Sequence, residues 1–200
     1  MIECTWHPAY ALIKRYEELG MVIEYVLLLP EEGAAPDMHK EAALAGMEII
    51  AQRFEDSNAR TMAEYPELKS EQFKKITWDE TAMRGQRQSA ELFFSEPDAY
   101  YEDKPGRYDK VIRWVPNQDY AYAFLDPPYG NPLVTSDWRT LNGMLFSIPG
   151  KLEIMNWANE WATEWSNYFE EGDEWWGTFF WTVFDPVQNM YIVIAASATD

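Results

Sequence analysis

Residues 178–196 read TFFWTVF-DPVQN-MYIVIAA, and this stretch decides the fold. The two outer runs, Thr178–Phe184 and Met190–Ala196, are rich in aromatic and β-branched residues, which pack well on a pleated sheet. The five residues between them, Asp185 to Asn189, include the proline and asparagine that favour a turn. The stretch therefore predicts a β-hairpin.

Two long helices are predicted to pack against this hairpin. The first spans 37–56 and has one apolar face. That face consists of Ala43, Leu44, Met47, Ile50, Ala51 and Phe54. The second spans 151–169, where four rings recur at helical spacing: Trp157, Trp161, Trp165 and Tyr168. This row of rings fits either the core side of a helix or an interface, and the spacing does not separate the two.

Shorter elements fill the rest of the chain. Proline in the first turn and glycine after the last predict a helix over 8–20. Residues 22–29 form a strand or a buried continuation, because periodicity does not decide so short a run. Residues 57–94 lean towards helix, and 111–115 and 120–125 predict a pair of strands. Ser136-Asp137 begins a helix that runs to Phe146.

Helices mostly in the first half and strands mostly in the second predict an α+β fold. We expect an antiparallel sheet, drawn mainly from the C-terminal half, packed against the long helices. A chain of 200 residues with 47% hydrophobic content can bury one core, so we expect a single domain over 1–200. The loop 95–107 is where any subdomain break would fall.

The charge of the chain limits its partners. Acids outnumber bases 34 to 16, the net charge is −18 and the isoelectric point is near 4.4. Nucleic acids and anionic membranes need Lys and Arg, so we expect neither as a direct partner. Basic proteins, cations or no charged partner at all stay open, and so does a charge that merely keeps an aromatic-rich protein soluble.

The chain also lacks the signals of export. Cys4 is the single cysteine, so no internal disulfide forms. The N-terminus has neither the basic start nor the apolar run of a signal peptide, and the longest apolar run, 21–29, is too short to span a membrane. We therefore expect a cytoplasmic protein.

The last fifty residues combine carboxylates with six of the ten tryptophans. Such rings supply contact area and the acids steer a basic partner. The predicted partner-binding residues are Glu160, Glu164, Glu170, Glu171, Asp173, Glu174, Trp175 and Trp176. If the second of the two adjacent tryptophans begins a strand, one ring enters the core and the other faces the partner.

No catalytic or metal site is evident in the sequence, and we expect no cofactor. The histidines, His7 and His39, do not have zinc-ligand spacing with Cys4, and the alternating ligands of a calcium-binding loop are missing. Carboxylate-pair catalysis on carbohydrate stays open as the enzyme alternative, because any two of 34 acids could meet across a tryptophan-lined cleft. We expect a binding protein rather than an enzyme.

The string Phe124-Leu125-Asp126-Pro127-Pro128-Tyr129-Gly130 resembles the catalytic motif of amino-group DNA methyltransferases. That resemblance implies a strand before the motif, an acid that accepts hydrogen bonds from the target amine and a ring that stacks on a flipped base. The Gly-x-Gly turn that would cradle S-adenosylmethionine is missing from this chain, and the acidity disfavours DNA. We therefore predict that Asp126 to Tyr129 is a strand-terminating turn.

In general character, the chain resembles the immunity proteins that bacteria pair with secreted toxins, and phage inhibitors that mimic DNA. The −18 charge and the acidic block Glu170 to Trp176 carry this resemblance, and no diagnostic motif adds to it. The run Glu174 to Asp185 also resembles an uncharacterised bacterial family. The resemblance implies a cytoplasmic binding protein that neutralises a basic protein partner such as a toxin.

Overall fold

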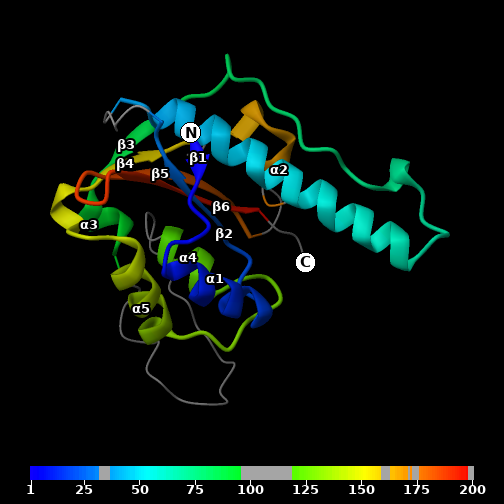
Figure 1. Ribbon diagram of the computed structural model, residues 1–200, viewed down its shortest axis with the longest axis horizontal. Coiled ribbons are helices and arrows are strands. Elements are labelled where there is room, and N and C mark those ends of the chain that lie inside the picture. The colour runs from blue at the N-terminus through cyan, green and yellow to red at the C-terminus, as the bar shows by residue number, and fades with distance from the viewer. Residues whose placement is uncertain (32–36, 96–118, 159–162, 171, 173–175, 198–200) are drawn as a thin grey trace.

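A computed structural model describes residues 1–31, 37–95, 119–158, 163–170, 172 and 176–197. At its centre lies a six-stranded antiparallel sheet with strand order β1-β2-β6-β5-β4-β3 (Figure 1). The strands are β1 (Ile2–Glu3), β2 (Glu24–Leu29), β3 (Gln86–Gln88), β4 (Glu153–Asn156), β5 (Thr178–Asp185) and β6 (Met190–Ser197). The helices are α1 (Ala9–Glu18), α2 (His39–Glu64), α3 (Ala90–Phe93), α4 (Asp119–Leu125) and α5 (Thr135–Leu145). Short 3-10 turns are η1 (Ser70–Gln72), η2 (Pro149–Lys151), η3 (Thr163–Trp165) and η4 (Asn167–Phe169).

The predicted hairpin forms the middle of the sheet. β5 and β6 pair in register from Thr178 opposite Ser197 to Asp185 opposite Met190. β2 pairs with the other side of β6, and β4 with the other side of β5. Both strands of the hairpin are buried along almost their whole length. Helices cover both faces of the sheet, so the central strands are mainly apolar on both faces instead of alternating.

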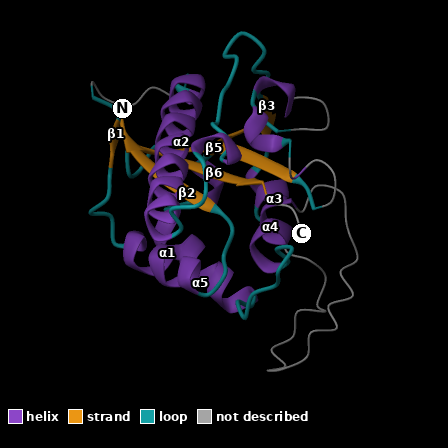
Figure 2. Ribbon diagram, turned by 90° about the vertical axis from the view of Figure 1, so that its right-hand side faces the viewer, coloured by secondary structure: helices purple, strands orange, loops and turns teal. Residues whose placement is uncertain are grey.

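One face of the sheet is covered by α2, which crosses it as a single long helix (Figure 1, Figure 2). Met47 and Ile50 of this helix are buried in a cluster with Val193 of β6 and Phe180 of β5. Gly46 brings the helix backbone close to the sheet, because a β-carbon there would lie 2.7 Å from both methyl groups of Val193. The contact between α2 and the sheet is therefore tight.

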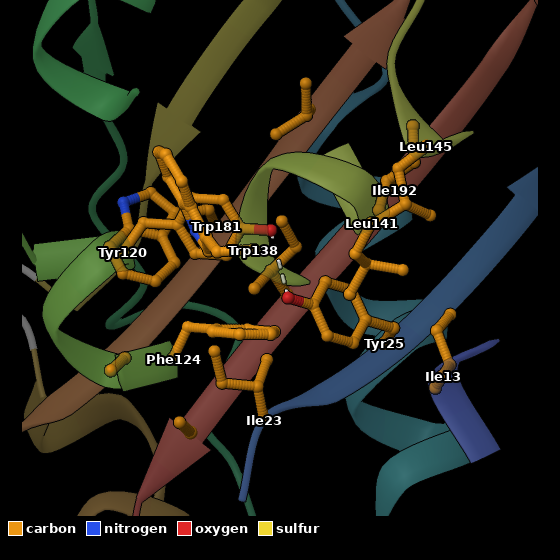
Figure 3. Close-up of a cluster of buried hydrophobic side chains, with 14 of the residues drawn as sticks. Ile13, Ile23, Tyr25, Tyr120, Phe124, Trp138, Leu141, Leu145, Trp181 and Ile192 are labelled. Carbon is orange, nitrogen blue, oxygen red and sulfur yellow. Dashed lines mark hydrogen bonds between the residues drawn. The ribbon is translucent and has the colours of Figure 1, made fainter. Parts of the chain in front are cut away.

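The opposite face carries α1, α4 and α5 (Figure 2). Figure 3 shows their side chains meeting those of β2, β5 and β6 in one cluster, with Phe124, Trp138 and Trp181 at its centre. A short polar chain crosses this cluster: the hydroxyls of Tyr25 and Tyr120 lie 2.9 Å apart, and the Tyr120 hydroxyl donates to Asn142 Oδ1 at 2.7 Å. These bonds fix α4 and α5 relative to β2.

The α+β fold is confirmed, with the two longest strands drawn from the C-terminal half. The helix predicted over 8–20 is α1, and its end has the expected glycine, since Gly20 has a φ of +93°. Residues 22–29 contain a strand, β2, and the helix begun at Ser136-Asp137 is α5. The helix predicted over 37–56 is α2, which continues to Glu64.

The prediction of a long helix over 151–169 is wrong. Residues 153–156 form β4, which pairs with β5, and η3 and η4 follow it. The helical spacing of the rings is accidental, because their positions depend on distant partners: the Trp157 indole donates to Thr182 Oγ1 at 2.9 Å, and the Trp165 indole donates to the carbonyl of Trp157 at 2.8 Å. Packing outweighs local periodicity here.

The strand predicted over 120–125 is also wrong, because these residues form α4. Alternation over six residues fits a strand, but every residue of 120–125 except Tyr122 is buried, which a helix packed against the sheet on one side and against α5 on the other allows. The prediction that 57–94 is mostly helical holds only up to Glu64, where α2 ends, and in the short α3. The chain between these two helices is mainly irregular and includes β3. The strand predicted over 111–115 and the loop 96–107 lie outside the described residues. None of the helices in the described parts of the chain is both long and apolar enough to cross a membrane.

Candidate functional site

The described part of the predicted acidic interface begins at η3 and η4, which pack onto the sheet. Trp165 and Phe169 are buried there, with their ring centroids 5.3 and 6.1 Å from that of Phe180 in β5. Their neighbours in sequence, Glu164 and Glu170, are exposed. The buried rings therefore hold these two carboxylates at the surface.

Hydrogen bonds fix Gly172 and Gly177, the described residues on either side of 173–175. The Gly172 amide donates to Ser197 Oγ at 3.2 Å, and the Gly177 amide donates to the Gly172 carbonyl at 2.9 Å. A β-carbon at Gly172 would lie 2.3 Å from the Gly177 carbonyl oxygen, so only glycine permits this approach. Gly172, in the acidic segment Glu170 to Trp176, and Gly177, just after it, are thus tied to the end of the sheet where β5 begins and β6 ends.

One of the two exposed carboxylates, Glu170, forms a surface ion pair. Glu170 is 69% exposed and its Oε2 lies 3.0 Å from the ammonium nitrogen of Lys74. A surface pair of this kind contributes little to stability, about 0–1 kcal/mol, because water screens it. Glu170 therefore remains available to a stronger cationic partner at small cost.

Trp176, the second tryptophan of the adjacent pair, enters the core. It is 8% exposed, packs against Phe179 with ring centroids 5.0 Å apart, and its indole donates to the Asp126 carbonyl at 2.7 Å. One of the two rings was expected to do this. The remaining predicted partner-binding residues lie outside the described parts of the chain: Glu160, Glu171, Asp173, Glu174 and Trp175.

The structure adds an exposed tryptophan that sequence reasoning missed. Trp78 is 37% exposed and its backbone forms an antiparallel bridge with Ser166, between Glu164 and Glu170 in sequence. The two residues that follow it, Asp79 and Glu80, are exposed acids. The run Trp-Asp-Glu at 78–80 was a usable signal, but basic residues lie on both sides of it, Lys74 and Lys75 before and Arg84 and Arg87 after, which hid its acidic character.

Of the row of rings predicted for 151–169, those that the structure describes belong to the core. Trp157, Trp165 and Tyr168 are buried on the α2 face of the sheet. The position of Trp161 lies outside the described residues. For these three rings the core interpretation is confirmed, and they present no surface to a partner.

A buried polar group lies beside these rings. The indole of Trp157 can only donate, so Thr182 Oγ1 accepts from it and donates its own proton to Nδ1 of His39, 2.8 Å away. Burial, together with the charge of Arg87, lowers the pKa of His39 to about 4. His39 is therefore neutral at pH 7 and has a structural role. Among the described residues, no three His, Cys, Asp or Glu side chains gather as metal ligands.

A polar groove of about 460 Å³ lies between α1 and the C-terminal half of α2. Arg53 lies beside it and donates to Glu3 Oε1 at 2.6 Å, to Glu24 Oε2 at 2.9 Å and to the Tyr25 carbonyl at 3.2 Å. Lys14 pairs with Glu17 at 2.6 Å. The carboxylates of Glu17 and Glu24 are thus held by cations, the pattern of structural ion pairs rather than of an acid and a nucleophile.

The Asp126 to Gly130 segment is a turn, but it ends a helix and not a strand. It follows α4 directly, and the Gly130 amide donates to the Pro127 carbonyl at 2.9 Å. The prediction of a turn is confirmed, while the strand before it was wrong. The methyltransferase motif requires that strand, so the resemblance loses its structural context.

Comparison with protein-family models, with curated proteins and with solved structures found no match for this chain.

Proposed function

We propose that this chain is a cytoplasmic acidic binding protein, an immunity protein or inhibitor that neutralises a basic protein partner such as a toxin. The observation that supports it is that Gly172 of the acidic segment is tied to the end of the sheet, while Glu164 and Glu170 are exposed on either side of Ser166, whose backbone bridges that of the partly exposed Trp78. The buried rings that flank Glu164 and Glu170 hold these two carboxylates in place, which lowers the entropy lost on binding, and the net charge of −18 steers a basic protein towards the surface.

The arrangement favours binding over catalysis. A binder needs complementary charge and a few aromatic anchors, whereas a carbohydrate enzyme needs two facing carboxylates about 5–9 Å apart. The groove beside α1 offers Phe54 as its aromatic side chain, and its Glu24 is paired with Arg53. The described surface therefore supports a binding role better than it supports carboxylate-pair catalysis in this groove.

The partner is identified first, from the gene next to this one and by carbodiimide cross-linking in the native host, which joins carboxylates to lysines within contact distance. The decisive test then uses that purified partner. Lysine replaces the four acids of the segment, Glu170, Glu171, Asp173 and Glu174. We expect unchanged folding, slower association and a weaker dependence of the association rate on salt.

A control variant carries the same change of charge elsewhere. It places lysine at four exposed acids on and after α2: Glu41, Glu48, Glu64 and Glu67. If the segment is the interface, the first variant slows association far more than the control at low salt. Equal slowing by both variants would show that the overall charge steers the encounter and that the segment is only a solvated surface.

A further inference from the structure

Tyr129 is the most exposed of the large hydrophobic side chains that the structure describes, at 73%. It lies in the turn after α4, two residues from Pro127 and next to Pro128. A ring in this position leaves apolar surface in contact with water, which disfavours the free state by roughly 25 cal/mol for each Å² exposed. A partner that covers the ring removes that cost.

The turn that carries Tyr129 is rigid. Asn131 is buried, its amide donates to the Phe124 carbonyl at 3.1 Å, and its Oδ1 accepts from the Leu133 amide at 3.0 Å. Gly130, with a φ of +68°, closes the turn on Pro127. The ring is therefore displayed by a backbone that is already fixed, so that binding it costs little entropy.

The end of α1 lies beside this turn. A β-carbon at Gly20 would lie 3.5 Å from the Gly130 carbonyl oxygen, so the two turns are in contact, as Figure 1 shows for the chain after α4 and the end of α1. Leu19, 40% exposed, precedes Gly20, and exposed Glu18 precedes Leu19. The turn that carries Tyr129 thus lies against the turn that follows Leu19 and Glu18, and all three of these residues are exposed.

Trp176 links this turn to the acidic segment. Its indole donates to the carbonyl of Asp126, three residues before Tyr129, while its backbone ends the acidic segment. The buried ring thus joins the last residue of the acidic segment to the start of the turn. A partner steered to the acids is therefore brought close to the turn.

From this geometry we infer that Tyr129 is an aromatic contact for a cationic side chain, Arg or Lys, of the basic protein partner. The cation stacks on the exposed ring and Glu18 supplies the counter-charge, while Leu19 covers the methylene groups. This inference rests on the proposed function, because that function supplies the basic partner. It adds a contact outside the acidic segment and makes Trp176 a positioning residue instead of a contact.

The test places the photo-cross-linker benzoylphenylalanine at residue 129 of the full chain in its native host. A control carries it at Trp6, which is 68% exposed in the loop between β1 and α1. We expect residue 129 to capture the same basic protein that carbodiimide joins to the acidic segment, and residue 6 not to capture it. If carbodiimide captures a basic protein but residue 129 does not, the inference fails and the proposed function stands. If neither captures a basic protein, both fail.

Substitutions then measure the contact with the captured partner. Tyr129→Ala is expected to raise the dissociation constant about tenfold or more, mainly through faster dissociation. Tyr129→Phe keeps the ring and should stay within about threefold of the parent, and Trp6→Ala should leave binding unchanged. Because the ring is exposed, Tyr129→Ala should not shift the urea midpoint, which separates lost contact from lost folding. Binding by Tyr129→Ala at the parent's affinity would overturn the inference.

Discussion

Replacing Gly46 by alanine tests the contact between α2 and the sheet. In an exposed helix this change stabilises a protein by about 1 kcal/mol, because glycine is the poorer helix former. At Gly46 the new β-carbon would lie 2.7 Å from two methyl carbons of Val193, which is 0.7 Å inside the 3.4 Å at which ordinary contact begins. Overpacking costs about 1–3 kcal/mol, and two contacts at 2.7 Å place this case in the upper part of that range, about 2–3 kcal/mol. After the helix-propensity gain of about 1 kcal/mol is subtracted, we expect a net loss of about 1–2 kcal/mol.

The matched control is Gly143→Ala in α5, where a β-carbon would meet nothing within 4 Å. This variant should gain about 0.5–1 kcal/mol from helix propensity alone. Both variants are measured by urea unfolding followed by tryptophan fluorescence, where a change of about 1 kcal/mol moves the midpoint by about 0.5 M. The two midpoints should move in opposite directions.

A double-mutant cycle assigns the loss to Val193. In a Val193→Ala background the two closest methyl contacts are gone, while the β-carbon of residue 193, at 2.9 Å, remains. Gly46→Ala should therefore cost less in that background, by about 1 kcal/mol. If Gly46→Ala stabilises the protein as much as Gly143→Ala, α2 does not lie against β6 as described and the reasoning is refuted.

Two further predictions concern buried polar groups. Asp185 is fully buried and accepts hydrogen bonds from Ser147 and from the Val187 and Gln188 amides. Burial by itself raises the pKa of its carboxyl group, but the hydrogen bonds from Gln188 and Ser147 outweigh burial and lower that pKa. Asp185→Asn leaves about two buried donors unpaired, so it should cost about 3 kcal/mol at pH 7. The folded-state pKa lies below the unfolded one, so this stability is present above about pH 4 and is lost on further acidification, and the difference from the parent in urea midpoint should shrink at pH 3. A difference of less than 1 kcal/mol at pH 7 would contradict the account. The pKa of His39 is lowered to about 4 by burial, so the parent should lose stability as pH falls from about 6.5 to 4, while the unfolded chain takes up the proton. His39→Gln should flatten the midpoint over that range, and an unchanged slope would exclude His39 as its source.

The sequence by itself determined the elements whose structural signal lies within their own residues. The hairpin was predictable because aromatic and β-branched runs flank a proline-asparagine turn, a signal confined to nineteen consecutive residues, 178–196. α1 was predictable from Pro8 and Gly20 because proline and glycine act on their own backbone. For the candidate site, composition alone indicated acids and rings close together.

Only the tertiary structure decided which rings are buried and which are displayed. The Trp157 indole meets Thr182 and the Trp176 indole meets the Asp126 carbonyl, partners 25 and 50 residues away, which no local pattern reveals. Contacts far apart in sequence also accompany the helix at 120–125: the Tyr120 hydroxyl bonds to that of Tyr25 across the core, a partner that the local alternation does not reveal. Tyr129 is displayed since its turn is held by the buried side chain of Asn131. Local preferences differ by about 1 kcal/mol per residue or less, so the burial of one aromatic ring is enough to override several of them.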